Sequence, residues 1–330
     1  MKKILGIGNA LVDVLARMKG DELLSELHLR KGGMELVDEQ RGRQIMSAVT
    51  SLSPQRATGG SAGNAILALA RLGENPGFVG KVGRDDTALF FRQNFAEAGV
   101  STFLCETDAP TGVAYTLISP DGERTFGTCL GAAAQMTPTD VTPACFVGYD
   151  LLHIEGYLVQ NHTLIEHVAR EAKTKGLMLS LDMASPNVVS ADLDFFRHLV
   201  TNYIDIVFAN AEESAAFTGC VSPDEAAEEL AQCCSFAVVK LGSRGALVRR
   251  GKEVAQVPAR KVPVVDTTGA GDFFAAGFLY ALVRDATLAD ALRCGAFLSE
   301  HVIQQVGTHL SAEAWSEIRK GVGQILNAEK

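Results

Sequence analysis

The cysteines of the 330-residue chain show no regular spacing. Its seven cysteines are an odd, scattered set with no Cys-x-x-Cys pair and no ligand-like spacing to histidine. Disulfide frameworks and zinc sites need paired or regularly spaced ligands, so we expect neither. The pattern instead indicates reduced thiols in the core of a cytoplasmic protein.

The chain also lacks a long apolar run. No stretch approaches the ~20 consecutive apolar residues that span a bilayer. Two lysines precede an apolar run at the N-terminus, as in a signal peptide, but Asn9 and Asp13 interrupt that run. We therefore expect no membrane partner and a cytoplasmic location, with secretion as the minor alternative.

A surplus of basic residues is absent as well. The formal net charge is -9 and the sequence pI is about 5.3. Nucleic acids and anionic membranes attract basic surfaces, so broad binding to either is not expected. A local basic pocket for a small anion remains open, and a small molecule is the expected partner.

Short apolar runs alternate with helical patterns along most of the chain. Runs typical of buried strands are KILGIG, PGFVGKVG, YDLLHIEG, LMLSLDM, IDIVFAN and FAVVKLG. Segments with helical spacing lie between them, among them AGNAILALARLG and TLIEHVAREAKTKG. This alternation predicts an α/β fold, a doubly wound and mostly parallel sheet covered by helices on both faces.

Two stretches interrupt the alternation. Leu11 to Met18 alternates with period two, and Thr111 to Leu130 has the pattern of a hairpin with Pro-Asp-Gly in its turn. We expect antiparallel strands of one small sheet that covers a cleft as a lid. The predicted division gives residues 1–10, 41–100 and 131–330 to the α/β core and residues 11–40 and 101–130 to the β lid. A second subunit that covers the lid, giving a homodimer, is as open as a monomer.

A glycine-rich turn opens an apolar helix in VVDTTGAGDFFAAGF, residues 264–278. The backbone N–H groups of Gly269, Ala270, Gly271 and Asp272 have no partner inside the helix and lie at the positive end of its dipole. Such a turn binds anions, and the carboxylate of Asp272 can take a proton from a hydroxyl while the N–H groups hold a transferring phosphoryl. The alternative is an ordinary capped helix.

A second glycine-rich turn lies in TGGSAGNAILALARLG, residues 58–73. Gly59 and Gly60 loosen a turn before a helix, and the amide of Asn64 on the first helical turn can bind adjacent hydroxyls; a plain helix cap is the alternative. A dinucleotide fold would need G-x-G-x-x-G directly after the first strand, which is absent, as is a P-loop. A dehydrogenase is therefore the weaker hypothesis.

These two segments resemble the signatures of the ribokinase-like, or phosphofructokinase-B type, carbohydrate and nucleoside kinases. DTTGAGDFFAAGFL fits the C-terminal signature, and GGSAGNAILALARLGENPGFVGKVG is similar to the N-terminal one, except that Ile66 stands where a small residue is usual. The resemblance covers essentially the whole chain. It implies a ribokinase-like fold with a β lid and phosphoryl transfer from ATP with Mg2+.

The resemblance also implies roles for residues of the core. Asp272 corresponds to the catalytic base and Gly269, Ala270 and Gly271 to the anion hole. The expected nucleotide-binding residues, with magnesium organised by the first two and the phosphates approached by a lid arginine, are Asn210, Glu213, Lys240, Gly242, Ser243, Gly245 and Arg124. The alternatives are a helix cap for the first pair, a hairpin turn for Lys240 to Gly245, and a surface arginine.

On the acceptor side, the resemblance assigns substrate hydroxyls to Asn9 and Asp13, together with Gly59, Gly60 and Asn64. Asp266 and Thr268, near the loop 303–307, match the potassium-site region of several family members, and a turn cap is the alternative for Asp266. Ala296 falls where some sugar kinases place a polar residue near the adenine.

The acceptor itself is suggested by the lid. GNALVDV and KGGMELVD resemble the adenosine-kinase branch, and Met34, Tyr115 and Phe126 on lid strands could form an apolar wall for a nucleoside base. The alternative is that these side chains form the core of the lid or a dimer contact. The predicted reaction is phosphorylation of the primary hydroxyl of adenosine to give AMP. A kinase of free or phosphorylated sugars, or a non-catalytic sensor on the same fold, are the other hypotheses.

Overall fold

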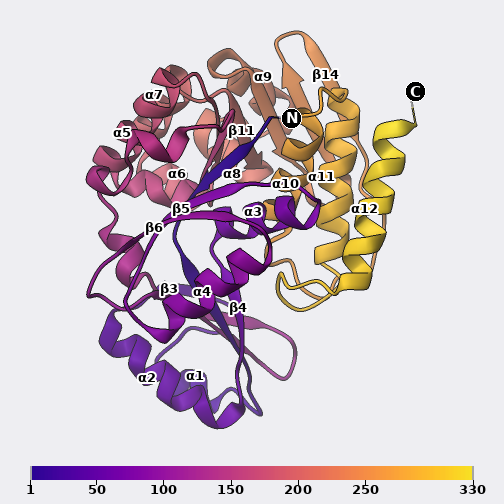
Figure 1. The fold of residues 1–330 in the computed structure, drawn as a ribbon. Helices are drawn as coiled ribbons and strands as arrows, with labels where there is room; N and C mark the ends of the chain where they lie inside the picture. The colour runs from indigo at the N-terminus through magenta and orange to yellow at the C-terminus, as the bar shows by residue number, and fades with distance from the viewer. Residues whose placement is uncertain (1, 329–330) are drawn as a thin grey trace.

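A computed structural model describes residues 2–328, and a nine-stranded sheet forms its centre (Figure 1). The strand order is β14-β13-β12-β11-β10-β9-β1-β5-β6. The strands are β1 Ile4–Ile7, β5 Gly77–Val82, β6 Ser101–Glu106, β9 Leu151–Ile154, β10 Met178–Asp182, β11 Ile206–Asn210, β12 Phe236–Lys240, β13 Ala246–Arg250 and β14 Glu253–Val257. All neighbours from β6 to β12 are parallel, and only β13 and β14 run antiparallel. The predicted mostly parallel sheet is confirmed.

Helices cover both faces of this sheet. The helices are α3 Ser61–Arg71, α4 Asp86–Glu97, α5 His162–Thr174, α6 Pro186–Ala191, α7 Leu193–Asn202, α8 Ala211–Thr218, α9 Pro223–Cys233, α10 Ala270–Leu282, α11 Leu288–Val302 and α12 Ala312–Asn327. Alternate residues of β12 belong to opposite cores, since Val238 packs with α3, α10 and α11, whereas Val239 packs with α5, α7 and α9. This two-sided burial explains the continuous apolar runs of the strands.

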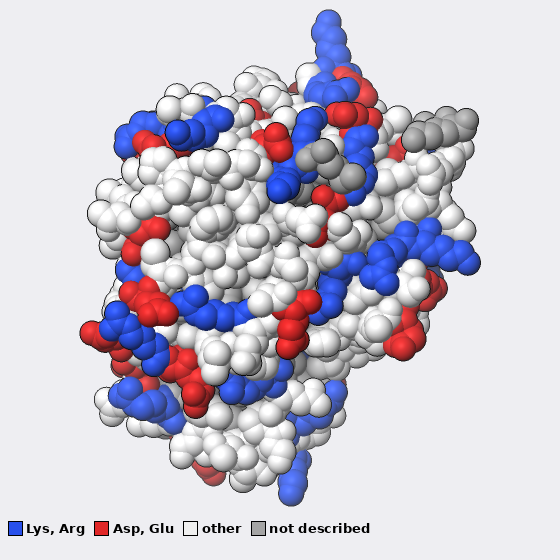
Figure 2. Space-filling model, in the orientation of Figure 1, with Lys and Arg blue, Asp and Glu red and all other residues white. Residues whose placement is uncertain are grey.

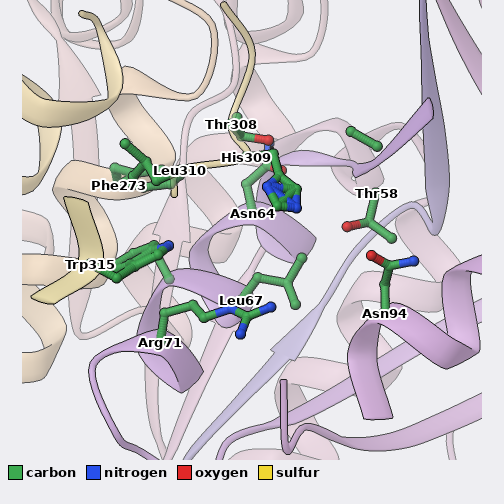
Figure 3. A pocket seen from close by; sticks show the side chains of 12 residues that line it. Thr58, Asn64, Leu67, Arg71, Asn94, Phe273, Thr308, His309, Leu310 and Trp315 are labelled. Atoms are coloured by element: carbon green, nitrogen blue, oxygen red, sulfur yellow. Dashed lines mark hydrogen bonds between the residues drawn. The ribbon is translucent and has the colours of Figure 1, made fainter. Parts of the chain in front are cut away.

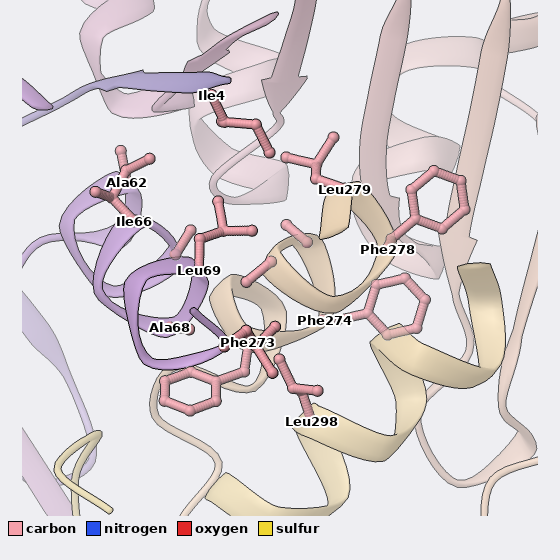
Figure 4. Close-up of a cluster of buried hydrophobic side chains, with 14 of the residues drawn as sticks. Ile4, Ala62, Ile66, Ala68, Leu69, Phe273, Phe274, Phe278, Leu279 and Leu298 are labelled. Atoms are coloured by element: carbon pink, nitrogen blue, oxygen red, sulfur yellow. The ribbon is translucent and has the colours of Figure 1, made fainter. Parts of the chain in front are cut away.

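Helix α10 is buried nearly all round. Phe273, Phe274 and Phe278 pack with α3 and α11 in the cluster that Figure 4 shows. A Cβ at Gly277 would lie 2.4 Å from the carbonyl oxygen of Cys294, so only glycine permits this approach of α11. The rigid packing fixes the N-terminus of α10, where the glycine-rich turn lies.

A second, five-stranded sheet has the order β3-β8-β7-β2-β4. Its strands are β2 Leu11–Arg17, β3 Met34–Leu36, β4 Gln55–Gly59, β7 Gly112–Ile118 and β8 Arg124–Cys129, and helices α1 Glu22–Glu26 and α2 Glu39–Val49 cover one face. The hairpin β7–β8 is antiparallel as predicted, but β2 pairs with β7 in parallel. No short turn joins β2 to β7, so no hairpin forces an antiparallel pairing.

The structure corrects the predicted division of the chain at two strands and one helix. Residues 41–49 of α2 were expected in the core, but Ile45 and Val49 pack against the small sheet. β4 lies in the small sheet, although residues 41–100 were expected in the core, and β6 lies in the large sheet, although residues 101–130 were expected in the lid. β4 pairs with β2 directly before α3 begins. β6 follows α4 and pairs in parallel with β5, which completes a strand-helix-strand unit.

Surface and thiol chemistry follow the composition. On the face shown in Figure 2, basic and acidic side chains are interspersed. All seven cysteines lie within residues 2–328 and are free thiols. Across that same range, the structure contains no helix with the length and apolar character that crossing a bilayer requires.

Candidate active site

The glycine-rich turn at the start of α10 presents backbone N–H donors. One predicted anion-hole donor is corrected, because the Ala270 N–H donates to the Thr267 carbonyl at 3.1 Å. Gly269 precedes the helix with φ of 75°, a conformation that favours glycine. A Cβ at Gly271 would lie 3.0 Å from Nζ of Lys240, so the ammonium group of β12 lies directly over the turn. Backbone dipoles and a lysine thus converge on one point, which suits a phosphoryl group.

A cavity of about 950 Å³ opens beside this turn. It lies at the carboxyl ends of β10, β11 and β12, where ligands bind in open parallel sheets. The predicted site residues that line it are Asn64, Asn210, Glu213, Lys240, Gly242, Ser243, Gly245, Thr268, Gly269, Ala270, Gly271 and Asp272. Apolar side chains, including Val262, Phe274 and Ala296, line another part of the cavity.

Asp272 connects the cavity to helix α3. Its carboxylate accepts hydrogen bonds from Oγ of Ser61 at 2.7 Å and from Nδ2 of Asn64 at 2.8 Å. Burial raises the pKa of Asp272 to about 6, and the nearby charge of Asp182 adds to the rise, while the bonds from Asn64 and Ser61 oppose it. A carboxyl that titrates near neutrality is suited to proton transfer.

Lys240 is held by an ion pair that the sequence did not predict. Its Nζ lies 2.9 Å from Oδ2 of Asp182, and both side chains are largely buried. Burial would lower the pKa of Lys240, but the carboxylates of Asp182 and Glu213 outweigh it, so the pKa is raised and the lysine stays charged. Asp182 closes the apolar run LMLSLDM, and its place at a strand end was the available signal.

Asn210 and Glu213 form a capping box at the start of α8. Oδ1 of Asn210 accepts from the Glu213 N–H at 2.8 Å, and the Glu213 carboxylate accepts from the backbone and side chain of Asn210, each at 2.7 Å. The helix-cap alternative therefore describes their geometry. Burial raises the pKa of Glu213 to about 7. Both side chains still line the cavity, so their magnesium role stays a prediction.

Asp13 and the two glycines before α3 lie together, outside the lining of the large cavity. A Cβ at Gly59 would lie 2.2 Å from Oδ1 of Asp13, and one at Gly60, whose φ is 86°, would lie 2.2 Å from the carbonyl oxygen of Asn9. Burial, together with the charges of Asp272 and Asp266, raises the pKa of Asp13 to about 7. The short distances leave no room for side chains at either glycine.

Asn9 points to a partner that the sequence did not predict. Its Nδ2 donates to Oε1 of Glu155 at 2.5 Å, and the other oxygen of Glu155 accepts from the Ala62 N–H at 3.1 Å. Burial raises the pKa of Glu155 to about 7. Glu155 thereby ties the strand end after β1 to the start of α3. It is the one glutamate of the predicted strand run YDLLHIEG and lies near the end of that run, which was the available signal.

The register of the small sheet separates the predicted lid residues. Met34, Phe126, Thr116 and Leu15 pair in one row and so lie on one face, the face that also carries Asp13 and Arg124. Leu15, which was not predicted, lies near Gly307 of the core. Met34 is 53% exposed at the edge strand.

Tyr115 lies on the opposite face of the lid. It packs in the core of the lid with Ile45, and a Cβ at Gly42 would lie 3.6 Å from its ring. The prediction that Tyr115 faces the acceptor is therefore corrected. Neighbouring strand residues point to opposite faces, and apolar residues on both faces concealed which face is covered by α2.

Arg124 does not line the large cavity. Its guanidinium forms an ion pair with Asp266 and donates to Oγ1 of Thr268 at 3.1 Å. Asp266 also accepts from the N–H groups of Thr268 at 2.9 Å and of Gly307 at 2.6 Å. The structure thus brings the predicted cation ligands Asp266 and Thr268 together, but both are bound by the guanidinium of Arg124.

A smaller pocket lies behind Asn64 (Figure 3). Its volume is about 50 Å³, room for a water molecule or two, and Leu67, Arg71 and Trp315 are among the residues that line it. Asn64 is shared between the two sites, because its Oδ1 accepts from Thr308 at 3.2 Å while its Nδ2 bonds Asp272. The small pocket is too small for a nucleoside or sugar.

Known proteins are similar to this chain in sequence and in fold. The sequence pattern of the group described as pfkB family carbohydrate kinase matches residues 34–315. Aminoimidazole riboside kinase of Salmonella typhimurium is 31% identical over 258 residues, 72% of this chain and 80% of that one.

Two solved structures are equally similar. The adenosine kinase from Sinorhizobium meliloti is 32% identical with a TM-score of 0.87, over 97% of this chain and 99% of that one. A probable sugar kinase from Rhizobium etli CFN 42 is 31% identical with a TM-score of 0.87, over 98% of each chain. Fold similarity therefore does not separate a nucleoside acceptor from a sugar acceptor.

Proposed function

The chain belongs to the pfkB family of carbohydrate kinases, and its relatives include sugar and nucleoside kinases. We propose that it transfers the γ-phosphoryl group of ATP to the primary hydroxyl of a nucleoside, with adenosine as the first candidate. The observation that carries the proposal is the carboxylate of Asp272. It lies at an open N–H turn beneath Lys240, and Ser61 and Asn64 hold it.

ATP would occupy the cavity of about 950 Å³. Its phosphates would lie along Lys240 to Gly245 and reach the turn Gly269 to Gly271, with the adenine toward Phe274 and Ala296. Among the described residues no cluster of three or more His, Cys, Asp or Glu could hold a metal. Mg2+ characteristically binds between nucleotide phosphates and one or two carboxylates, where it neutralises charge, and Glu213 would hold it through water.

The proposed transfer step uses Asp272, the N–H turn before it and Lys240, which lie close together. The acceptor oxygen attacks the γ-phosphorus in line, the bond to the ADP oxygen breaks, and Asp272 takes the hydroxyl proton. The N–H groups of Gly269 and Gly271 and the ammonium of Lys240 would stabilise the charge on the phosphoryl oxygens. The lid would exclude water from the site, which limits hydrolysis of ATP.

The acceptor would lie between the lid and α3. Asp13 and Asn64 would bind its hydroxyls, while Leu15, Met34 and Phe126 offer an apolar face for a base. A free or phosphorylated sugar is the second candidate. The buried polar group of Asn9 and Glu155 favours it, because a sugar offers hydroxyls on every side.

The test is ADP release with ATP and Mg2+ against adenosine, inosine, aminoimidazole riboside, ribose, fructose and fructose 6-phosphate. Turnover confined to nucleosides supports the apolar lid face as a base site. Turnover of sugars alone contradicts the nucleoside proposal and leaves the Asp272 mechanism in place. Absence of turnover with every acceptor, in protein that binds ATP, favours a sensor.

A further inference from the structure

Arg124 of the lid lies on both residues that were expected to hold a monovalent cation. The guanidinium contacts the carboxylate of Asp266 and, at 3.1 Å, Oγ1 of Thr268. The side chains of Arg124 and Asp266 are only 11% and 3% exposed. The pair joins β8 of the small sheet to the loop before α10, so it spans the two parts of the molecule.

The oxygens at this point do not fit an additional cation. A potassium ion needs several oxygen ligands free of other donors. Here both oxygens of Asp266 accept backbone N–H groups, and the remaining contacts are taken by Arg124. In the adjoining loop 303–307, the buried side-chain atom without a hydrogen-bond partner is Nε2 of Gln305, which is a donor and no ligand. A cation beside the guanidinium would also meet like-charge repulsion.

We propose that Arg124 takes the place of a monovalent cation in this chain, and that it positions the phosphoryl-binding turn through Asp266 and Thr268. One guanidinium balances one buried carboxylate, as one potassium ion would. The planar guanidinium of arginine can also donate to two acceptors at once, and a lysine ammonium is less suited to this. The positive charge that balances Asp266 is therefore supplied by a residue of the small sheet rather than by an ion from solution.

The position of the pair explains why it bears on the reaction. Thr268 immediately precedes Gly269, whose φ of 75° starts the N–H turn, and Asp266 lies three residues before Gly269. The bond from the Thr268 N–H to Asp266 shapes this segment. Closing the lid onto Asp266 therefore orders the turn that receives the phosphoryl group, so Arg124 acts as a positioning residue.

The first measurement is cation binding without any acceptor, by thallium NMR and by thermal unfolding in potassium, sodium or tetramethylammonium chloride of equal ionic strength. Wild-type protein should show no specific thallium binding and no cation-dependent melting temperature. In Arg124→Gln the carboxylate loses its partner, so thallium should bind and potassium should raise the melting temperature by about 2–4 °C over tetramethylammonium.

The second measurement is turnover in the same salts, and this arm alone rests on the proposed function. Wild-type kcat should vary less than about twofold between salts. Arg124→Gln should lose about 10- to 100-fold in tetramethylammonium and regain a large part in potassium. Arg124→Lys should keep more activity than Arg124→Gln and respond less to potassium.

Arg17 supplies the matched control. It lies in the same row of the small sheet as Arg124, through Ile118, and is exposed. Arg17→Gln should behave as wild type in both measurements. Specific thallium binding by wild-type protein, or an Arg124→Gln variant without cation response, overturns the proposal. If Arg124→Gln does not fold, the wild-type and Arg124→Lys arms decide it. Cation results stand even if every acceptor fails, so the two proposals fail separately.

Discussion

The two sheets meet at one site but contribute to it in different ways. At the carboxyl edge of the large sheet, charged and polar side chains are paired with each other, as in the ion pair of Lys240 with Asp182 and the hydrogen bond of Asn210 to Glu213. On the open face of the small sheet, Met34 and Leu36 are more than half exposed, and the side chain of Asp13 lies on this same face. The buried, already paired groups at the sheet edge suit binding of the phosphoryl donor. The open face of the small sheet suits an acceptor whose binding supplies the missing contacts.

The largest effect is expected on the core side, from Asp272→Asn. It should lower kcat by about 10²- to 10⁴-fold, because the base is lost, while ATP binding measured by calorimetry persists. Asp285→Asn is a suitable control, since Asp285 is exposed and forms a surface ion pair with Lys2. In wild-type protein kcat/KM should rise with pH through the pKa of Asp272, about 6, and the pKa of Asp13, about 7, and reach its plateau above both. Wild-type turnover in Asp272→Asn would remove the base from the mechanism.

Lys240→Met should lower kcat by about 10²- to 10³-fold, as loss of one charge-stabilising donor does. It should also cost about 3–5 kcal/mol of unfolding free energy, because the buried carboxylate of Asp182 loses its charged partner and keeps only the Ala184 N–H among the described contacts. The double variant with Asp182→Asn should recover stability in denaturant melts but not kcat. Recovery of both would make the pair a purely structural feature of the core.

Asp13→Asn tests the lid side and should lower kcat/KM for the acceptor by about 10²-fold, since a charged hydrogen-bond partner is lost. Although the variant loses activity, it should be more stable than wild type at high pH. The pKa of Asp13 is raised from 3.8 to about 7, so its contribution to stability is full below pH 3.8 and is lost as pH rises through 7. At pH 8 the variant should therefore unfold at higher denaturant concentration than wild type, by on the order of 1 kcal/mol. Equal stability at pH 8 and pH 5 relative to wild type would contradict this.

The smallest effect is expected from Phe126→Ala, which should raise the KM of a nucleoside acceptor by about tenfold and leave the KM of ATP unchanged. Tyr115→Phe is the matched lid control, because Tyr115 faces α2 and the change keeps its volume. If Tyr115→Phe raises the acceptor KM while Phe126→Ala does not, the assignment of the two lid faces is reversed.

Sequence reasoning reached the parts of the site that are local in the chain. The turn Gly269 to Gly271, with Asp272 on the first turn of α10, follows from contiguous residues whose backbone preferences act without distant partners. The same holds for the β7–β8 hairpin, where the Ser119 N–H donates to the Glu123 carbonyl at 2.8 Å. Strand-helix alternation likewise determined the two-sided sheet.

Tertiary structure decided which distant groups meet. Lys240 pairs with Asp182, Arg124 with Asp266 and Asn9 with Glu155, each across a long stretch of chain. The side to which Tyr115 points, and the sheets that receive β4 and β6, also depended on strand order and register. The sequence by itself determined the elements and the phosphoryl-binding turn, because backbone preference is local. Charge pairing and facing arise only once the sheets are assembled, because they depend on distances that the chain order does not contain.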